Sequence, residues 1–336
     1  MSGQAVARDA SSVAGRVSSF SANYMNEIGL VAIILTLYLV FGATANGFSS
    51  INNQLTILRD VASIAIAAWA MTLVIVAGEI DLSIGPMVAF ISVILAFMLK
   101  GGVPLALAIP AAILAGAALG TLAGVLRAMF DVPSFVATLG LWSALRGMAL
   151  FITNALPVTY KENDFMELLG DEVLGIPTSA VIMLVLFVVF FVISRYTAFG
   201  RSVFAVGGNA NAAHLCGINV KRVRVLIFSL SGCLAAVTGV LMTARLGSGN
   251  AGAASGLEFD VIAAVVIGGT SLSGGRGSMI GTMLGVFVIT LIGNGLVLRG
   301  INPFFQEVVR GVIIVVAVLA NLMATRYRRM RAIRGD

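Results

Sequence analysis

Long apolar runs that carry almost no charge, separated by short polar breaks, recur along the whole chain of 336 residues. A membrane-spanning helix needs about 20 predominantly apolar residues, so most runs are long enough to cross a bilayer. Only 11% of the residues are charged and 59% are hydrophobic, whereas soluble domains have about 25% charged residues. So few charges cannot cover a water-exposed surface, and lipid is therefore the expected solvent for most of the chain.

The apolar runs predict an all-α polytopic membrane protein with about ten transmembrane helices. The third and eighth runs are short for a full crossing, which predicts short broken or re-entrant elements at those two places. The runs are 29–47, 61–77, 84–99, 103–126, 134–153, 177–194, 225–246, 259–272, 278–298 and 305–323.

The distribution of Lys and Arg predicts the orientation of these helices. Fourteen of the 21 basic residues lie in one alternating set of connections, which includes both termini, and only five lie in the other set. Cytoplasmic segments retain cations, so both termini are expected in the cytoplasm. The predicted organisation is a cytoplasmic N-terminal tail at 1–28, a membrane domain at 29–325 and a basic cytoplasmic tail at 326–336. The acidic connection 154–176 is expected outside.

No pattern of catalytic, cofactor-binding or metal-ligating residues is found. His214 is the only histidine, and Cys216 and Cys233 lack the spacing of a metal site. The glycine-rich stretch 268–278 has no lysine, so it does not encode a phosphate-binding loop. The net charge of +6 is spread over loops instead of forming one patch, which argues against a nucleic-acid-binding protein. We therefore do not expect an enzyme.

The inner connection 195–224 is unusually long, basic at both ends and rich in small residues in its middle. Asn209 is a good N-cap, the residues 210–216 tolerate a helix, and Gly217 can take the left-handed conformation that ends one. The sequence therefore predicts one short helix. Two interpretations remain open for it, a plain surface turn and a helix that docks on a partner.

Two polar breaks interrupt the apolar pattern, AGEIDLSIGP at 77–86 and GGTSLSGGRGS at 268–278. Interrupted segments of this kind point to the substrate path in transporters. In the first break, Glu79, Asp81 and Ser83 have two interpretations. They can cap the third helix through its free N–H groups and its dipole, or they can line or gate a path.

Other features within the predicted spans require protein neighbours. A charge at membrane depth costs about 2.5–3.5 kcal/mol on insertion scales, so each one needs a partner. For Arg146 we expect an ion pair or a carbonyl partner inside the bundle. For Arg310 we expect a local pair with Glu307, three residues earlier on the same helix face. In 111–124 glycines recur every fourth residue, which predicts close helix packing.

Four segments together resemble the membrane permease subunits of ribose-type, carbohydrate-uptake ABC importers. The similarity keeps the same order along nearly the whole chain, from about residue 29 to 325. The segments are AGEIDLSIGPMVA at 77–89, PSFVATLGLWSALRGMAL at 133–150, GRSVFAVGGNANAAHLCGINVKRVR at 200–224 and FDVIAAVVIGGTSLSGGRGSMIGTMLG at 259–285.

The resemblance implies a multi-pass subunit of the bacterial inner membrane that forms the translocation path for a sugar or related polyol and has no enzymatic activity. The implied partners are a second permease copy in a homodimer or heterodimer, a tandem-domain ABC ATPase that holds the ATP and Mg, a periplasmic sugar-binding protein, and membrane lipid. No cofactor in this chain and no nucleic acid are implied. The alternative hypothesis is an ion-coupled secondary transporter or channel that uses Asp81 or Glu79.

The resemblance also assigns candidate residues. The loop 195–224 looks like the family's cytoplasmic coupling loop, and 154–176 becomes a periplasmic loop. The residues expected to couple to the ATPase are Gly208, Asn209, Ala212, Ala213, His214, Gly217 and Ile218. A neutral polar solute needs hydroxyl, amide and backbone partners, so the candidates for lining the path, chosen by position, are Glu79, Asp81, Ser83, Thr138, Trp142, Asn250, Thr270, Ser271 and Asn294.

Overall fold

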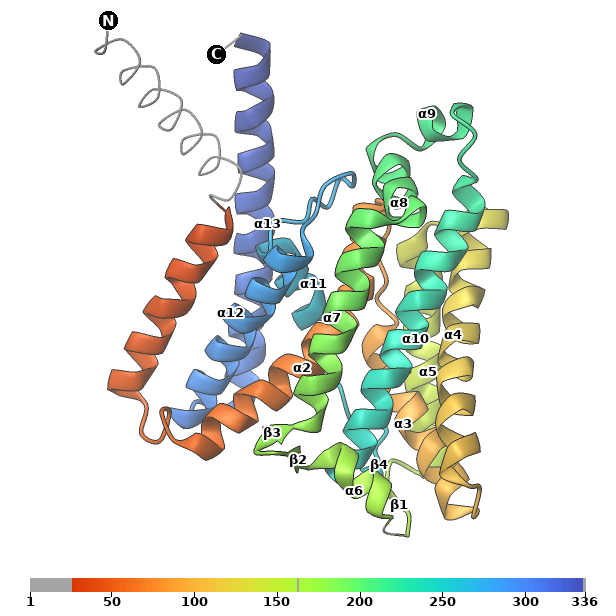
Figure 1. Cartoon of the computed structure of the whole chain (residues 1–336), viewed down its shortest axis with the longest axis vertical. Coiled ribbons are helices and arrows are strands. Elements are labelled where there is room, and N and C mark those ends of the chain that lie inside the picture. The colour runs from red at the N-terminus through yellow and green to blue at the C-terminus, as the bar shows by residue number, and fades with distance from the viewer. Residues whose placement is uncertain (1–25, 162, 335–336) are drawn as a thin grey trace, which may run out of the picture.

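The computed structural model describes residues 26–161 and 163–334, and nearly all of its regular structure is helical (Figure 1). The longer elements are the N-terminal helix Asn26–Thr44, α2 (Ile51–Val76), α3 (Ile84–Lys100), α4 (Leu105–Met129), α5 (Ser134–Thr153), α7 (Thr178–Tyr196), α10 (Val220–Leu246), α11 (Leu257–Ile267), α12 (Met279–Leu298) and α13 (Pro303–Arg334).

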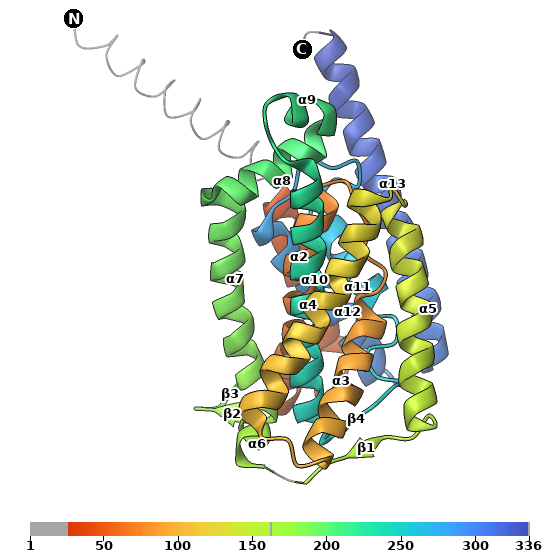
Figure 2. The same ribbon diagram turned by 90° about the vertical axis from the view of Figure 1, so that its right-hand side faces the viewer.

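The remaining elements are short and lie at the two ends of the bundle. At one end, which we call the α9 end, are α8 (Ala198–Gly208) and α9 (Ala210–Leu215). At the other, which we call the strand end, are α6 (Asp164–Gly170) and four two-residue strands (Figures 1 and 2). The strands form two antiparallel pairs, β1 (Val158–Thr159) with β4 (Ser248–Gly249) and β2 (Glu172–Val173) with β3 (Ile176–Pro177).

Seven helices among the described residues are long and apolar enough to cross a membrane, which confirms a polytopic membrane protein. The third and eighth predicted runs correspond to α3 with 17 residues and α11 with 11 residues, and neither is among the seven. At 1.5 Å per residue, α11 covers about 16 Å, roughly half of the hydrocarbon core. Short elements at these two places are therefore confirmed, whereas ten full crossings and the cytoplasmic location of the termini remain predictions.

The predicted boundaries differ from the observed ones mainly at polar helix ends. The helix α2 begins at Ile51, well before the apolar run at 61, because Ser50 caps it by accepting a hydrogen bond from Asn53 N at 3.3 Å. A cap fixes where a helix starts, and hydropathy does not detect it. Of the two predicted tails, residues 1–25 lie outside the described residues, and 326–334 continue α13.

Glycines bring α4 and α10 into direct backbone contact, and α4 crosses in front of α10 in Figure 2. A methyl group at Gly120 would overlap the carbonyl oxygen of Phe228, and one at Gly232 would overlap that of Gly116. A methyl group at Gly124 would lie 2.7 Å from the Cα of Val225. The close packing predicted for 111–124 is therefore confirmed.

Replacing Gly120 with Ala should destabilise the protein by about 1–3 kcal/mol, because the added methyl group forces α4 away from α10. The matched control is Gly140→Ala on α5, where no atom lies within 4 Å of the new methyl group. Thermal unfolding of the purified protein in detergent measures both. The packing account predicts a lower Tm for G120A and an unchanged or slightly higher Tm for G140A, and equal Tm values would contradict it.

Candidate functional site

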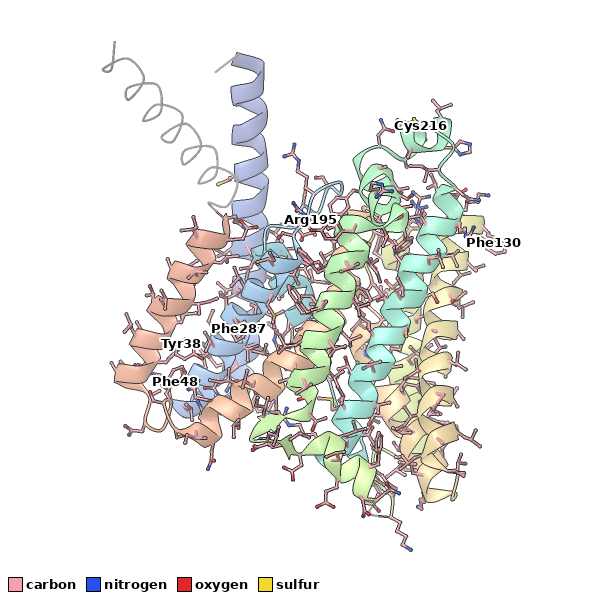
Figure 3. The ribbon with its side chains drawn as sticks, viewed as in Figure 1. Tyr38, Phe48, Phe130, Arg195, Cys216 and Phe287 are labelled. Atoms are coloured by element: carbon pink, nitrogen blue, oxygen red, sulfur yellow. The ribbon has the colours of Figure 1, made fainter. Side chains whose placement is uncertain are left out.

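The short helix predicted in the loop 195–224 is present as α9. The side chain of Asn209 caps it by accepting from Ala212 N at 3.0 Å. The chain leaves the helix through Gly217 at φ +84°, a left-handed conformation that glycine adopts without strain. The tip of the helix projects from the bundle, as the position of Cys216 in Figure 3 shows, and Leu215 there is 87% exposed. The helix α8, which precedes α9, was not predicted.

The predicted coupling residues do not all lie on the projecting surface. Ala213 is buried in the main hydrophobic core, so it holds α9 onto the protein and cannot meet a partner. Ile218 is half-buried and Gly208 is the last residue of α8. The residues of the predicted set that are exposed on or beside α9 are Gly208, Asn209, Ala212, His214 and Gly217.

The end of α8 meets both polar breaks through backbone contacts, and we call this meeting point the glycine junction (Val76, Gly78, Gly207, Gly274 and Gly275). Gly275 N donates to the carbonyl oxygen of Val76 at 2.8 Å. A methyl group at Gly207 would overlap that same oxygen, and one at Gly274 would lie 2.7 Å from Gly207 O and 3.1 Å from Gly78 N. The loop that carries α9 therefore touches the end of α2 and both breaks directly.

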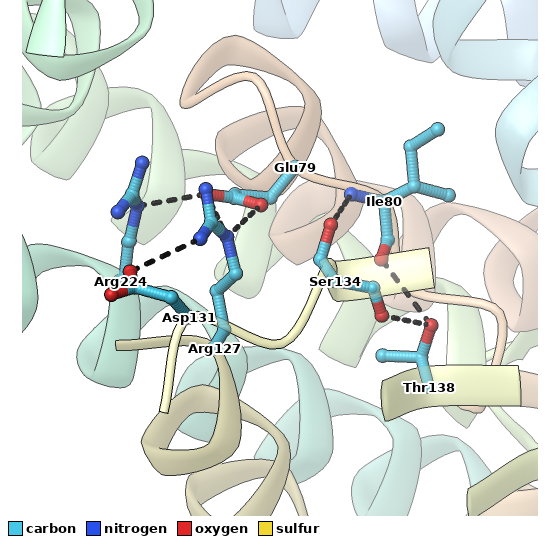
Figure 4. Close-up of polar contacts among 7 residues, drawn as sticks. All are labelled: Glu79, Ile80, Arg127, Asp131, Ser134, Thr138 and Arg224. Atoms are coloured by element: carbon cyan, nitrogen blue, oxygen red, sulfur yellow. Dashed lines mark hydrogen bonds and ion pairs between the residues drawn. The ribbon is translucent and has the colours of Figure 1, made fainter. Parts of the chain in front are cut away.

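In the first break, Glu79 is held by two arginines (Figure 4). Arg127 Nε, at the end of α4, donates to both carboxylate oxygens at 2.9 Å, and Arg224 Nε, near the start of α10, lies 2.8 Å from Oε1. Glu79 is only 4% exposed, and Arg127 also reaches Asp131 at 3.8 Å. The carboxylate thus ties the break to α4 and α10 and is neutralised by its neighbours.

The backbone of the first break is satisfied by hydroxyl groups on the first turns of α5. Ile80 N donates to Ser134 Oγ at 3.2 Å and Leu82 N donates to Thr138 Oγ1 at 3.1 Å (Figure 4 shows Ser134 and Thr138 beside the break). Irregular backbone at membrane depth is tolerated only where protein or water satisfies its polar groups. Thr138, predicted to line the path, therefore stabilises the break.

Asp81 is fully buried and links the first break to α10. Its Oδ1 accepts from Ser83 N at 2.9 Å and from Ser83 Oγ at 2.6 Å, and its Oδ2 accepts from Ser231 Oγ at 2.6 Å. The prediction that Ser83 caps α3 through its side chain is wrong, because that side chain bonds to Asp81 instead. The aspartate takes over part of the capping role.

The second break forms a tight turn next to the glycine junction. Ser271 N donates to the carbonyl oxygen of Arg276 at 3.0 Å, and Ser271 Oγ accepts from Ser273 N at 3.3 Å. Thr270 is fully buried beside it. Ser271 therefore shapes this turn, and Thr270 is buried next to it.

The other three path candidates lie elsewhere. Trp142 Nε1 donates to Glu258 Oε1 at 2.8 Å, while Asn250 closes a local turn by accepting from Gly252 N at 2.8 Å. Asn294 exchanges two hydrogen bonds with Asn53, at 2.9 and 3.1 Å. The structure therefore brings the residues Glu79, Asp81, Ser83 and Thr138 together in the first break and does not assemble all nine candidates around one path.

The predictions for the two arginines within the predicted spans, Arg146 and Arg310, have different outcomes. Arg146 donates to the carbonyl oxygens of Ala251 and Ala253, which confirms a carbonyl partner. The predicted local pair of Arg310 with Glu307 is wrong. Arg310 Nε instead lies 2.6 Å from Asp260 Oδ1 on α11, because the packing of α13 against α11 supplies a carboxylate that helix spacing cannot reveal.

Sequence reasoning missed several residues that complete these contacts, among them Arg127, Arg224, Ser231 and Glu258. For Arg127 and Arg224, the charge bias predicted only the side of the membrane on which they lie. Glu258 immediately precedes the apolar run 259–272, which contains Asp260. Acidic residues in or beside a membrane-spanning run are rare, so these two indicate a functional site or a buried ion pair. Ser231 carried no signal, because serine is common in apolar helices of this chain.

Replacing Glu79 with Gln should destabilise the protein by about 2–3 kcal/mol, because two guanidinium groups lose their shared carboxylate. Removing one partner of a fully buried pair costs about 3–5 kcal/mol, and here water reaches the arginines. The matched control is Asp131→Asn at the exposed edge of the same cluster, expected within about 0.5 kcal/mol of the parent. Thermal unfolding compares the two, and equal values would show that the pair does not hold the break.

Comparisons with known proteins agree on one family. Residues 53–318 match the family model described as branched-chain amino acid transport system / permease component. The probable ABC transporter permease protein YphD of Escherichia coli K12 is 70% identical over 310 residues, which are 92% of this chain and 93% of YphD.

Two further relatives cover similar shares of their own length. The ribose import permease protein RbsC of E. coli K12 is 37% identical over 92% of this chain and 97% of RbsC. The L-arabinose ABC transporter permease protein AraH of Azospirillum brasilense is 34% identical over 91% of this chain and 90% of AraH. No solved structure matches the chain. The chain therefore belongs to this family of ABC-transporter permease components, and it is a multi-pass membrane protein that acts as a transport subunit and not as an enzyme.

Proposed function

We propose that this permease subunit works in the bacterial inner membrane and carries a sugar or related polyol. Its relatives include permease proteins named for ribose, L-arabinose and xylose transport. The breaks offer hydroxyl groups and backbone groups, and the acid in the first break is neutralised by two arginines. Such surroundings suit a neutral polar solute better than an ion.

The glycine junction is the observation that carries the proposed mechanism. It places the end of α8, one residue before the cap of α9, against the end of α2 and both polar breaks. A force applied to α9 therefore reaches the breaks through backbone contacts, with no flexible side chain between them. Main-chain atoms in van der Waals contact cannot move closer together. A displacement of α9 must therefore move the breaks or separate the atoms of the glycine junction.

In this proposal, α9 is the coupling helix that docks on a separate ATPase subunit with two nucleotide-binding domains. That subunit holds ATP and Mg²⁺ and supplies the energy. A periplasmic binding protein delivers the solute at the strand end, and two permease copies, identical or different, enclose the path. The predicted orientation, with the α9 end in the cytoplasm, is part of this proposal and agrees with the excess of cations there.

The alternative, an ion-coupled transporter that uses Glu79 or Asp81, is not favoured by any contact. Glu79 is engaged by two guanidinium groups, and both oxygens of Asp81 accept hydrogen bonds from serines. Transport by this chain alone in vesicles, without an ATPase, would support the alternative and contradict the proposal.

Replacing Leu215 with Asp should lower co-purification of the ATPase subunit by about tenfold or more, because it puts a charge on the exposed end of α9, where the ATPase is proposed to dock. Leu215 is 87% exposed, so the permease itself should fold normally. The matched control is Leu174→Asp in the turn between β2 and β3, where the side chain is 97% exposed at the opposite end. Pull-down of the co-expressed complex measures both, and equal recovery from the two variants would refute docking through α9.

A further inference from the structure

A cavity of about 450 Å³ lies between α2, α10, α11, α12 and α13. It is lined by residues from the first turns of α2 and from the last turns of α10 and α12, so it lies toward the strand end, away from the glycine junction. Pockets for small ligands have volumes of about 300–1,000 Å³, so this one is large enough for a small solute. Of the nine path candidates, it contains only Asn294.

Two ion pairs between different helices form part of the cavity wall. Arg245 on α10 lies 2.8 Å from Asp60 on α2, and Arg310 on α13 lies 2.6 Å from Asp260 on α11. Each pair is electrically neutral, so the wall attracts neither cations nor anions through a net charge. Carboxylates accept hydrogen bonds and guanidinium groups donate them, which together match hydroxyl groups that do both.

Among the described residues, the hydroxyl group of Thr290 is an unsatisfied polar group next to the cavity. Thr290 lines the cavity, is only 5% exposed, and its Oγ1 has no hydrogen-bond partner within the described part of the chain. Buried Thr238 and Thr243 on α10 donate to the carbonyl oxygens four residues earlier, at 3.0 and 2.8 Å. Buried polar groups are normally satisfied, and less than 1 Å² of the Thr290 oxygen is accessible, so a guest can meet this hydroxyl only after the side chain rotates toward the cavity.

The remaining wall is apolar. Ile289 and Val297 of α12 and Ile313 of α13 lie beside these polar groups. A sugar presents C–H groups on its ring faces and hydroxyl groups around its rim, so it can use both kinds of surface. A fully apolar guest would leave the Thr290 hydroxyl unsatisfied, and a charged guest would have to break one of the ion pairs.

We propose that this cavity is a solute site within each permease subunit, which takes a neutral polyhydroxylated molecule of monosaccharide size before it reaches the polar breaks. This inference rests on the proposed function and deepens it, because it locates a site and assigns contacts that differ from the breaks and from α9. In this proposal the two ion pairs bind hydroxyl groups of the solute, and the Thr290 side chain rotates so that its hydroxyl bonds to another.

Two variants test the site in the assembled complex. Gly293 lines the cavity and a Cβ atom added there meets no atom within 4 Å, so Gly293→Leu introduces a side chain into the cavity from an unobstructed position. Thr290→Val removes the hydroxyl and keeps the shape. The controls are Gly29→Leu on the N-terminal helix, where an added Cβ atom is equally unobstructed, and Thr238→Val on α10.

The probes are D-ribose, D-xylose and L-arabinose, measured by saturation-transfer NMR on the permease–ATPase complex in nanodiscs and by uptake into proteoliposomes with the binding protein. For the sugar that the parent complex transports, G293L should abolish the NMR signal and lower uptake by about tenfold or more. T290V should weaken binding by about five- to tenfold, as expected for one lost hydrogen bond. Both controls should stay within about twofold of the parent.

Three results would overturn the proposed cavity site. Normal binding and uptake in G293L would overturn the cavity site and leave the proposed function intact. Loss of uptake in G293L with unchanged sugar binding would also overturn it, because the cavity would then be only structural. If the parent complex transports none of the three sugars although it hydrolyses ATP, the proposed substrate class fails, and the site proposed for it fails with it.

Discussion

Backbone N–H and C=O groups that lie outside a regular helix need other hydrogen-bond partners, and this constraint shapes the chain at its two polar breaks. A continuous helix satisfies its own backbone, but 77–83 and 268–278 are not helical. The first break obtains its partners from Ser134 and Thr138 on α5, and the second obtains one from the carbonyl oxygen of Val76. Irregular backbone can therefore exist here only while these particular helices stay in place.

The same requirement explains why polar side chains and glycines concentrate where the helices are interrupted. Asp81 and Glu79 connect the first break to α10 and α4, so that a shift of either helix must move the break or cost those contacts. Glycine is needed at Gly207 because backbone atoms of α2 and of the second break occupy the space that a side chain would take. Together these contacts make the end of α8 and both breaks one mechanical unit, which is the basis of the proposed coupling.

The sequence was sufficient to predict the parts of the fold that depend on local patterns. Apolar runs predicted the long helices, the shortness of the third and eighth runs predicted α3 and α11, and Asn209 with Gly217 predicted α9. The partners of side chains could not be predicted in the same way. Arg310 pairs with Asp260 and not with Glu307, because the packing of separate helices decides which carboxylate is near.

The candidate site was predicted only in part, for the same reason. The four candidates of the first break are close in sequence or lie on the first turns of α5, and the structure groups them. Trp142, Asn250 and Asn294 were chosen by position along the chain, and each has a different neighbour in space. The cavity beside Thr290 had no signal in the sequence, since its walls come from five helices.

Uptake per ATP hydrolysed, compared between Gly207→Ala and Gly208→Ala in the reconstituted complex, tests the central claim most directly. A methyl group at Gly207 would overlap the carbonyl oxygen of Val76, whereas one at the adjacent Gly208 meets no atom within 4 Å. If the glycine junction transmits the motion of α9, G207A should hydrolyse ATP but lose most of its uptake, and G208A should retain both. Equal coupling in the two variants would contradict the account.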